Sequence, residues 1–167
     1  QTLCDWECCL VDDGSTDGTA DFLEKISAED KRFRLYRKKP EGNPSRSRNF
    51  ALRMAKGRYV AFCDHDDFWH PQKLAVQKKA FETFPNLALV HTERIIWKKK
   101  TLPDNFPKLE FDEGSLQTNL EKKALYQQMT ITNSSLVVPR DLAEKVGYLN
   151  ENIIAVDDYH FCLKLAQ

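Results

Sequence analysis

Apolar residues along the chain alternate between short compact runs and longer stretches with helical spacing. The run at 6–11 (WECCLV) is rich in strand-forming residues and ends at an acidic turn, which indicates a buried strand. Residues 17–26 place their large apolar side chains on one helical face, and 33–37 alternates like a second strand. The chain therefore opens with a predicted strand, helix and strand.

The same alternation continues through the rest of the chain. A loop rich in Pro and Gly follows the second strand, and Ser45 can then cap a helix over 46–56 that Gly57 stops. Strands that alternate with helices predict an α/β fold with a mostly parallel sheet covered on both faces. We predict further strands at 58–63, within 87–97 and at 131–138, and further helices at 71–84, 115–128, 139–147 and 157–167.

Length and composition narrow the class of protein. The 167 residues suit one domain with a sizeable core. Because 25 Lys and Arg balance 25 Asp and Glu, no global charge favours nucleic acid or an anionic membrane. No apolar run is long enough to span a bilayer. The five cysteines form an odd count without a CxxC pair, which disfavours a disulfide framework or zinc site and favours a reducing cytoplasm.

The acidic stretch after the first predicted strand fits two different chemistries. As a calcium loop, Asp13, Ser15 and Asp17 fall at positions 1, 3 and 5, with Gly18 at 6 and Glu24 at 12. The residues before this loop have no helical face, however, and no second such loop follows. As a strand-to-helix turn, the same residues lie where α/β sheets bind ligands. We favour the ligand-binding turn, although a purely structural turn would use the same residue types.

A second acidic stretch, CDHDDFW, follows the third predicted strand. It holds Asp64, Asp66 and Asp67, which repel one another unless a cation neutralises them. Carboxylate oxygens favour Mg²⁺ or Mn²⁺. We interpret His65 as facing solvent, with a nitrogen ligand as the alternative. An acidic approach to a helix that starts near Pro71 would explain at most one of the three carboxylates.

Two further pairs of charged residues stand at predicted helix starts. Arg46 and Arg48 follow the Gly-Pro loop, where a guanidinium group could face a nucleotide or its phosphates. Arg46 could equally be solvated. Asp157 and Asp158 open the last predicted helix, where Asp is also a good N-terminal cap.

Three motifs occur in a fixed order along the chain. They are VDDGSTDGT near the start, GNPSRSRNFALRMAKGRYVAFCDHDDFWHPQKL in the middle and SSLVVPRDLAEKVGYLNENIIAVDDYHFCLKLA near the end. Together they resemble glycosyltransferase family 2 over about residues 6–166. The resemblance implies a GT-A fold, with a mostly parallel mixed sheet flanked by helices.

The resemblance also implies an activity. The enzyme would move a sugar from a nucleoside diphosphate, for which we expect a UDP-sugar, to a hydroxyl of a saccharide or lipid-linked acceptor. We expect a role in polysaccharide or glycolipid synthesis of the cell envelope, in the cytoplasm or at the inner face of the membrane. A metal-dependent phosphotransferase or hydrolase and a non-catalytic nucleotide-sugar-binding module remain the alternatives.

Residue roles follow where this sequence matches the family. Asp12 and Asp13 can only accept hydrogen bonds when ionised, which suits a ring N–H or a ribose hydroxyl, and the resemblance implies that Asp13 contacts the base. Arg48 occupies the family's Arg-Asn position at the nucleotide. In the acidic stretch, the resemblance implies that Asp64 faces the ribose and Asp66 holds the Mn²⁺ or Mg²⁺ ion.

The end of the chain departs slightly from the family pattern. The family has Glu-Asp where this sequence has Asp157 and Asp158, and the second carboxylate is the family's catalytic base. One base without a nucleophilic pair implies direct displacement with inversion at the anomeric carbon. The family also has a strand before the first motif and a continuation after the last. We therefore expect 1–167 to be a single GT-A catalytic domain, incomplete at both ends.

Overall fold

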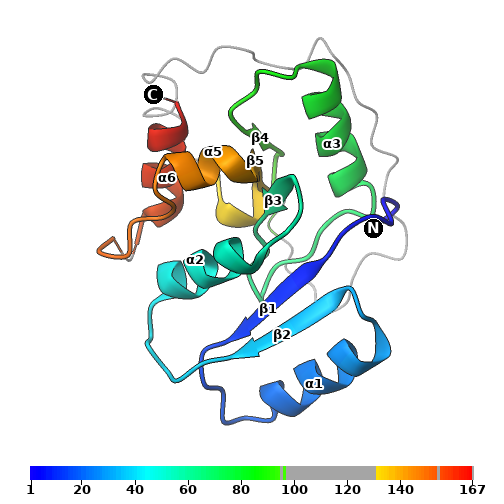
Figure 1. Cartoon of the computed structure of the whole chain (residues 1–167), viewed down its shortest axis with the longest axis vertical. Coiled ribbons are helices and arrows are strands. Elements are labelled where there is room, and N and C mark those ends of the chain that lie inside the picture. Colours follow the sequence, from blue (N-terminus) through cyan, green and yellow to red (C-terminus); the bar gives the residue numbers. More distant parts are fainter. Residues whose placement is uncertain (95, 97–130, 154, 167) are drawn as a thin grey trace.

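Strands and helices alternate through most of the chain, as the apolar pattern predicts. The computed structural model describes residues 1–94, 96, 131–153 and 155–166 (Figure 1). Its elements are β1 (Cys8–Asp12), α1 (Thr19–Glu29), β2 (Phe33–Arg37), α2 (Pro44–Met54), β3 (Tyr59–Ala61), α3 (Lys73–Thr83), β4 (Val90–His91), the 3-10 turn η2 (Asn133–Ser135), β5 (Leu136–Pro139), α5 (Arg140–Lys145) and α6 (Asp157–Leu165).

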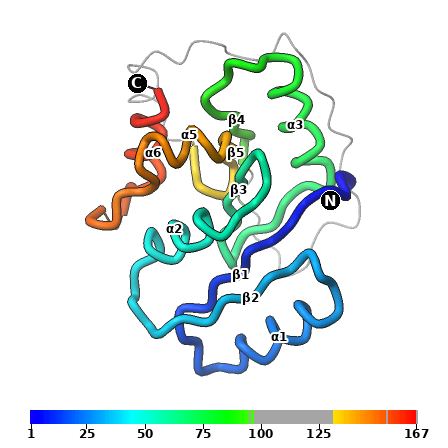
Figure 2. Tube along the Cα trace, in the orientation of Figure 1, coloured from blue at the N-terminus to red at the C-terminus, as the bar shows by residue number. Residues whose placement is uncertain are grey.

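The strands form two hydrogen-bonded groups. β1 pairs with β2 in parallel, from Cys8 opposite Phe33 to Asp12 opposite Arg37. β5 lies between β3 and β4 and runs antiparallel to both. Helix α2 lies between the β1–β2 pair and the helices α5 and α6, as the ribbon and the trace both show (Figures 1 and 2). The α/β class predicted from the sequence is confirmed, with antiparallel pairing in the second group.

The apolar core lies around the second group of strands. Leu136 and Val138 of β5 and Phe161 of α6 are each 0% exposed, and they pack together with Leu52 of α2. A smaller cluster joins α3 to β4 and β5. None of the helices in the described part of the chain is long and apolar enough to cross a bilayer.

Several boundaries differ from the sequence prediction. Helix α2 begins at Pro44 and its N-cap is Asn43, whose side chain accepts a hydrogen bond from the Arg46 N–H at 3.3 Å. Pro suits the first helical position because its missing N–H would have no partner there. The predicted cap, Ser45, is instead buried within the first turn. In addition, β1 is shifted to 8–12, β3 is shorter, and α3 starts at 73. The turn η2 replaces the start of the strand predicted at 131–138, and among the described residues of 87–97 only 90–91 is a strand. The predicted helix 115–128 lies outside the described residues.

The turn after β1 excludes the calcium-loop alternative. The residues before Asp13 form a strand, whereas that alternative needs a helix. Gly14 has φ +85°, and a Cβ atom on it would lie 2.4 Å from Cγ of Pro40. Only glycine fits both the backbone conformation and this close contact. The turn is therefore packed directly against the loop that follows β2.

Candidate active site

Asp12 ends β1 and is 3% exposed. Its Oδ1 accepts a hydrogen bond from the Ser15 N–H at 3.1 Å, which stabilises the turn. Its Oδ2 is buried without a hydrogen bond among the described residues, 3.8 Å from Nε of Arg37 on β2. One oxygen of Asp12 thus shapes the turn, and the other lies within ion-pair distance of Arg37.

Asp13 connects the turn to the loop between β2 and α2. Its carboxylate accepts hydrogen bonds from the Glu41 N–H at 3.2 Å and the Gly42 N–H at 2.9 Å. Backbone N–H groups hold a carboxylate in one orientation without a competing side chain. Asp13 therefore stands in a defined position at the carboxyl end of β1.

Arg48 joins three parts of the chain. Its Nη2 donates to Oδ1 of Asp64, after β3, at 2.6 Å, and its Nη1 donates to Oδ2 of Asp157, at the start of α6, at 2.9 Å. The Ser45 hydroxyl donates to the same Oδ2 of Asp157 at 2.8 Å. Helix α2 thus brings the acidic loop after β3 and the start of α6 to one place.

The backbone of the acidic loop is attached to the turn η2. The Asp64 N–H donates to the Ser134 hydroxyl at 2.9 Å, and the Trp69 indole N–H donates to the Ser134 carbonyl at 2.8 Å. Within the loop, the Asp67 N–H donates to the Asp64 carbonyl at 3.1 Å. Trp69 therefore attaches the end of the acidic loop to η2.

Asp66 lies at the exposed tip of this loop and makes no hydrogen bond with the described residues. His65 and Asp67 beside it are also exposed. Within the described ranges, no group of three or more His, Cys, Asp or Glu side chains is arranged to hold a metal ion. Mg²⁺-like ions are often bound by one or two carboxylates, with substrate phosphates and water completing the coordination. Asp66 fits that mode and not a site built from protein ligands alone.

The two carboxylates of α6 differ in their surroundings. Asp157 is 6% exposed and is held by Ser45 and Arg48, as described above. Asp158 is half-buried, and its Oδ1 accepts a hydrogen bond from the Tyr159 N–H at 2.7 Å. Burial raises the pKa of Asp158, and the negative charge of Asp157 raises it further, while the Tyr159 N–H and Arg48 oppose the rise. A carboxylate with a raised pKa is a stronger proton acceptor once it is ionised.

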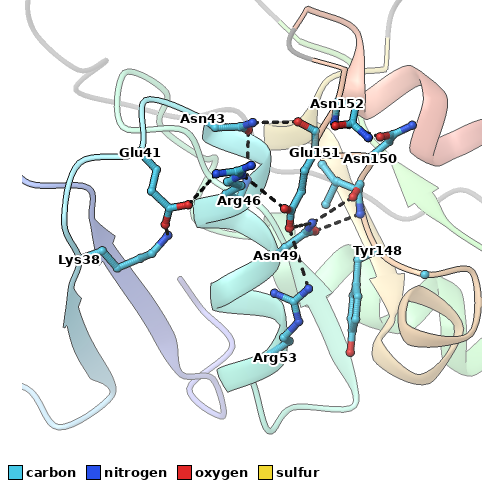
Figure 3. Close-up of polar contacts among 12 residues, drawn as sticks. Lys38, Glu41, Asn43, Arg46, Asn49, Arg53, Tyr148, Asn150, Glu151 and Asn152 are labelled. Carbon is cyan, nitrogen blue, oxygen red and sulfur yellow. Dashed lines mark hydrogen bonds and ion pairs between the residues drawn. The ribbon is translucent and has the colours of Figure 1, made fainter.

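Helix α2 also holds the segment that leads to α6. The Asn49 side chain donates to the Leu149 carbonyl at 3.0 Å and to Oε1 of Glu151 at 2.9 Å, and it accepts from the Leu149 N–H at 3.0 Å (Figure 3). The Asn43 side chain donates to the Glu151 carbonyl at 2.8 Å. These contacts fix residues 149–151 relative to the helix that carries Arg48.

Charged side chains of α2 and its neighbours line a hollow of about 260 Å³, and Figure 3 shows most of these side chains. Arg46 stands at its centre, 3.1 Å from a Glu41 carboxylate oxygen and 3.5 Å from one of Glu151. The sequence left open whether Arg46 was solvated, and in the structure it pairs with two carboxylates. The residues around the hollow are Lys38, Glu41, Arg46, Phe50, Arg53 and Glu151.

The structure brings five of the six predicted site residues into two groups. Asp12 and Asp13 lie at the end of β1, and Arg48 contacts Asp64 directly, while Asp158 adjoins the Arg48 partner Asp157. Asp66 makes no hydrogen bond or ion pair with the other five.

Two polar residues of α2 have roles that the sequence did not reveal. Ser45 and Asn49 fall at i and i+4, with Leu52 at i+7, which is the spacing of a buried helical stripe. Both side chains are buried and bind the segment 149–157. Polar residues on an otherwise buried stripe were the signal that could have revealed these contacts, because buried polar groups need partners.

Known proteins resemble this chain in sequence. The family model for glycosyl transferase family 2 matches residues 1–147. A chondroitin synthase of Escherichia coli is 30% identical over 173 residues, which take in 100% of this chain and 23% of that protein. The chain thus spans less than a quarter of the length of this relative.

Solved structures resemble it in fold. TarS of S. aureus, residues 1–349 in complex with UDP-GlcNAc, superposes with a TM-score of 0.72 at 21% identity, over 96% of this chain and 44% of that one. The mannosyltransferase PcManGT of Pyrobaculum calidifontis, in complex with GDP-Man and Mn²⁺, superposes with a TM-score of 0.68 at 21% identity, over 96% of this chain and 42% of that one. At these identities the likeness shows the GT-A fold alone. The family match covers most of the chain, and the chain belongs to glycosyl transferase family 2.

Proposed function

We propose that this domain transfers a sugar from a nucleoside diphosphate to an acceptor hydroxyl, with inversion at the anomeric carbon. The observation that carries the proposal is the Arg48 bridge between Asp64 and Asp157. It connects the residues expected at the donor with the helix start that carries the expected base. The names of the similar proteins support a nucleotide-sugar donor, since one is bound to UDP-GlcNAc and another to GDP-Man.

On the donor side, the two carboxylates at the end of β1 would bind the nucleoside. Asp13 is held by backbone N–H groups and would accept a hydrogen bond from the base, for which a uracil ring N–H is the partner we expect. Asp64 would accept from a ribose hydroxyl. Because Arg48 already contacts Asp64, its guanidinium group would stand beside the nucleotide and orient that carboxylate.

The diphosphate carries the charge that must be neutralised when it leaves. Asp66 would hold a divalent cation, Mn²⁺ or Mg²⁺, together with phosphate oxygens, as its exposed position at the loop tip allows. When bound, the cation would stabilise the departing diphosphate electrostatically. PcManGT, which shares the fold, was solved with Mn²⁺.

On the acceptor side, Asp158 would remove the proton from the attacking hydroxyl. Asp157 is held by Ser45 and Arg48, so it would position the helix start and leave Asp158 to act as the base. A single base without a nucleophilic pair favours direct displacement. By analogy with the chondroitin synthase that it resembles, the acceptor would be a growing saccharide, with a lipid-linked acceptor as the alternative. We place the reaction in the cytoplasm or at the inner face of the membrane.

Ligand binding and product analysis test this proposal together. Thermal shifts would be measured with UDP, GDP and other nucleoside diphosphates, each with and without Mn²⁺, because a ligand that binds only the folded state stabilises it. We expect one nucleotide to raise Tm, and Mn²⁺ to increase that rise. The sugar nucleotide of the same base would then be supplied with saccharide acceptors. Release of inorganic phosphate without sugar transfer would identify a phosphotransfer or hydrolase enzyme, and no binding at all would indicate a non-catalytic module.

A further inference from the structure

Lys73, in the first turn of α3, is a buried cation close to the acidic loop. Lys73 is 4% exposed, and its ammonium donates a hydrogen bond to Oε1 of Gln77 at 2.6 Å. It makes no ion pair with a carboxylate of the described residues. Burial without a neutralising partner is unfavourable for an ammonium, and it lowers the pKa of Lys73 to about 8. Lys73 therefore carries a cost in stability at neutral pH.

The Lys73 ammonium also lies against the Trp69 indole. Nζ is 4.3 Å from the centroid of the Trp69 ring, within the range of a cation–π contact. A desolvated cation is attracted to the ring more strongly than an exposed one. Burial therefore disfavours the Lys73 charge but strengthens the cation–π contact between Lys73 and Trp69.

Trp69 connects Lys73 to the backbone of the acidic loop. The indole N–H donates to the Ser134 carbonyl, and the Ser134 hydroxyl accepts from the Asp64 N–H. Lys73 is therefore connected to Asp64, the partner of Arg48, through two intervening residues: the Trp69 indole binds the Ser134 main chain, and the Ser134 hydroxyl binds the Asp64 main chain.

The other side of Lys73 is anchored to the core. Gln77 is 1% exposed, and its amide donates to the carbonyls of Val90, in β4, and Ser135, in η2, each at 3.0 Å. The Gln77 amide is held in place by these two hydrogen bonds. Its Oε1 therefore accepts from the Lys73 ammonium in a fixed position, next to the Trp69 ring. The contact between Lys73 and Trp69 is therefore stabilised by β4 and η2 through Gln77.

We propose that Lys73 is a positioning residue for the acidic loop, acting through Trp69 and Ser134 to hold Asp64 where Arg48 and the nucleotide meet it. Lys73 itself is buried and would act without touching the donor. The effect of Lys73 on nucleotide binding rests on the proposed function. The contact between Lys73 and Trp69 is independent of that function.

Lys73→Met tests the proposal because it keeps the length and apolar stem of the side chain and removes the charge. We expect the variant to melt at the same temperature as the wild type or higher, since a buried charge is gone. The part of its tryptophan emission that Trp69→Phe lacks should change; Trp6 and Trp97 also emit. Its affinity for the nucleoside diphosphate with Mn²⁺ should fall by roughly 2- to 30-fold, the range of one cation–π contact. A role in stability alone predicts the opposite pattern, with a lower Tm and unchanged affinity of the folded fraction.

Four further variants show whether the effect runs through Trp69. Lys73→Arg keeps a cation that can lie against an indole, so it should retain most of the affinity and the emission. Trp69→Phe, alone and with Lys73→Met, tests the route: the double variant should bind no worse than Trp69→Phe alone, because residues acting through one contact are not additive. Lys78→Met, on the same helix but in an exposed pair with Glu82, is the matched control and should change neither signal.

The outcomes separate this proposal from the proposed function. Unchanged fluorescence and unchanged affinity in Lys73→Met would overturn the positioning role. Additive losses in the double variant would also overturn it, since Lys73 would then act by another route. If the wild type binds no nucleoside diphosphate, the proposed function is wrong, and Lys73 then has no role in donor binding. The tryptophan emission of Lys73→Met would still report whether Lys73 positions Trp69.

Discussion

The β1–β2 half of the molecule and the β3–β5–β4 half are stabilised in different ways. In β1 only Asp12 is fully buried, and α1 buries only Ala20. In the other half, Leu136 of β5 and Phe161 of α6 are 0% exposed and belong to the main core. The half that carries Asp12 and Asp13 therefore depends on turns and polar contacts, whereas the half that carries Asp158 depends on apolar packing.

Helix α2 is where the two halves meet. It packs near β1, and its buried polar side chains, Ser45 and Asn49, bind the segment that leads to α6. Arg48 adds the contacts to Asp64 and Asp157. A change in one half should therefore reach the other through α2, and otherwise stay local. The predictions below test this division.

Asp158→Asn should have the largest effect, confined to the acceptor side. The amide has nearly the same size and can still accept from the Tyr159 N–H, but it cannot take a proton from the acceptor. We expect the transfer rate to fall by ~10²–10⁴-fold, the usual loss when a general base is removed, with donor affinity unchanged. Initial rates at saturating donor and calorimetric titration of the donor would measure the two quantities.

Asp157→Asn is the matched control for that experiment. Asp157 has a supporting role, so its loss should lower the rate less. Activity that survives in Asp158→Asn and disappears in Asp157→Asn would exchange the two roles. Activity that survives in both would remove α6 from the mechanism.

Phe161→Ala should destabilise the fold far more than a matched change in the other half. Phe161 is fully buried and packs edge-on against Phe62, so its truncation leaves a cavity, with an expected loss of about 3–5 kcal/mol. Phe33 in β2 is half-buried and packs against Trp6 at its edge, so Phe33→Ala should cost no more than about 2 kcal/mol. Urea unfolding would measure both. Equal losses would show that the two halves do not differ in the way described.

Asp66→Ala should remove the effect of Mn²⁺ on nucleotide binding and leave the fold intact. The carboxylate is exposed and makes no hydrogen bond or ion pair with the described residues, so the fold does not depend on it. We expect Mn²⁺ affinity in the presence of nucleotide to fall at least about tenfold, a loss typical of altered metal sites. Asp67→Asn, beside it, should keep the Mn²⁺ response. A full Mn²⁺ response in Asp66→Ala would refute the assignment of Asp66 as the metal ligand. If only Asp67→Asn loses the Mn²⁺ response, Asp67 is the metal ligand.

The pH dependence of transfer should show the smallest shift. Asp158 must be ionised to act as a base, and its pKa is raised, so activity should fall as the pH drops through a value above that of an ordinary Asp. Asp157→Asn removes a negative charge that raises this pKa, so the acidic limb of the rate profile should move to lower pH, by no more than about one unit. Asp141→Asn, an exposed carboxylate in α5, should leave the limb in place. A limb that moves upward in Asp157→Asn would contradict the electrostatic account.

Much of the fold could be predicted from local patterns. The compact apolar runs and the helical stripes located β1, β2, α1 and α2 within a few residues, because periodicity depends on which face of an element is buried. The antiparallel pairing of β5 could not be predicted in this way. Pairing direction depends on how distant segments meet, and local periodicity does not record it.

The sequence by itself determined which residue types stand at the ends of strands and helices, and the three motifs that identify the family. Carboxylates after strands and arginines at a helix start are local features, so Asp13, Asp66 and Arg48 could be recognised without a structure. Only the tertiary structure decided that Arg48 bridges Asp64 and Asp157, and that Lys73 is buried against Trp69. Such contacts join residues of different elements, and a side chain's partners and burial depend on what the fold places around it.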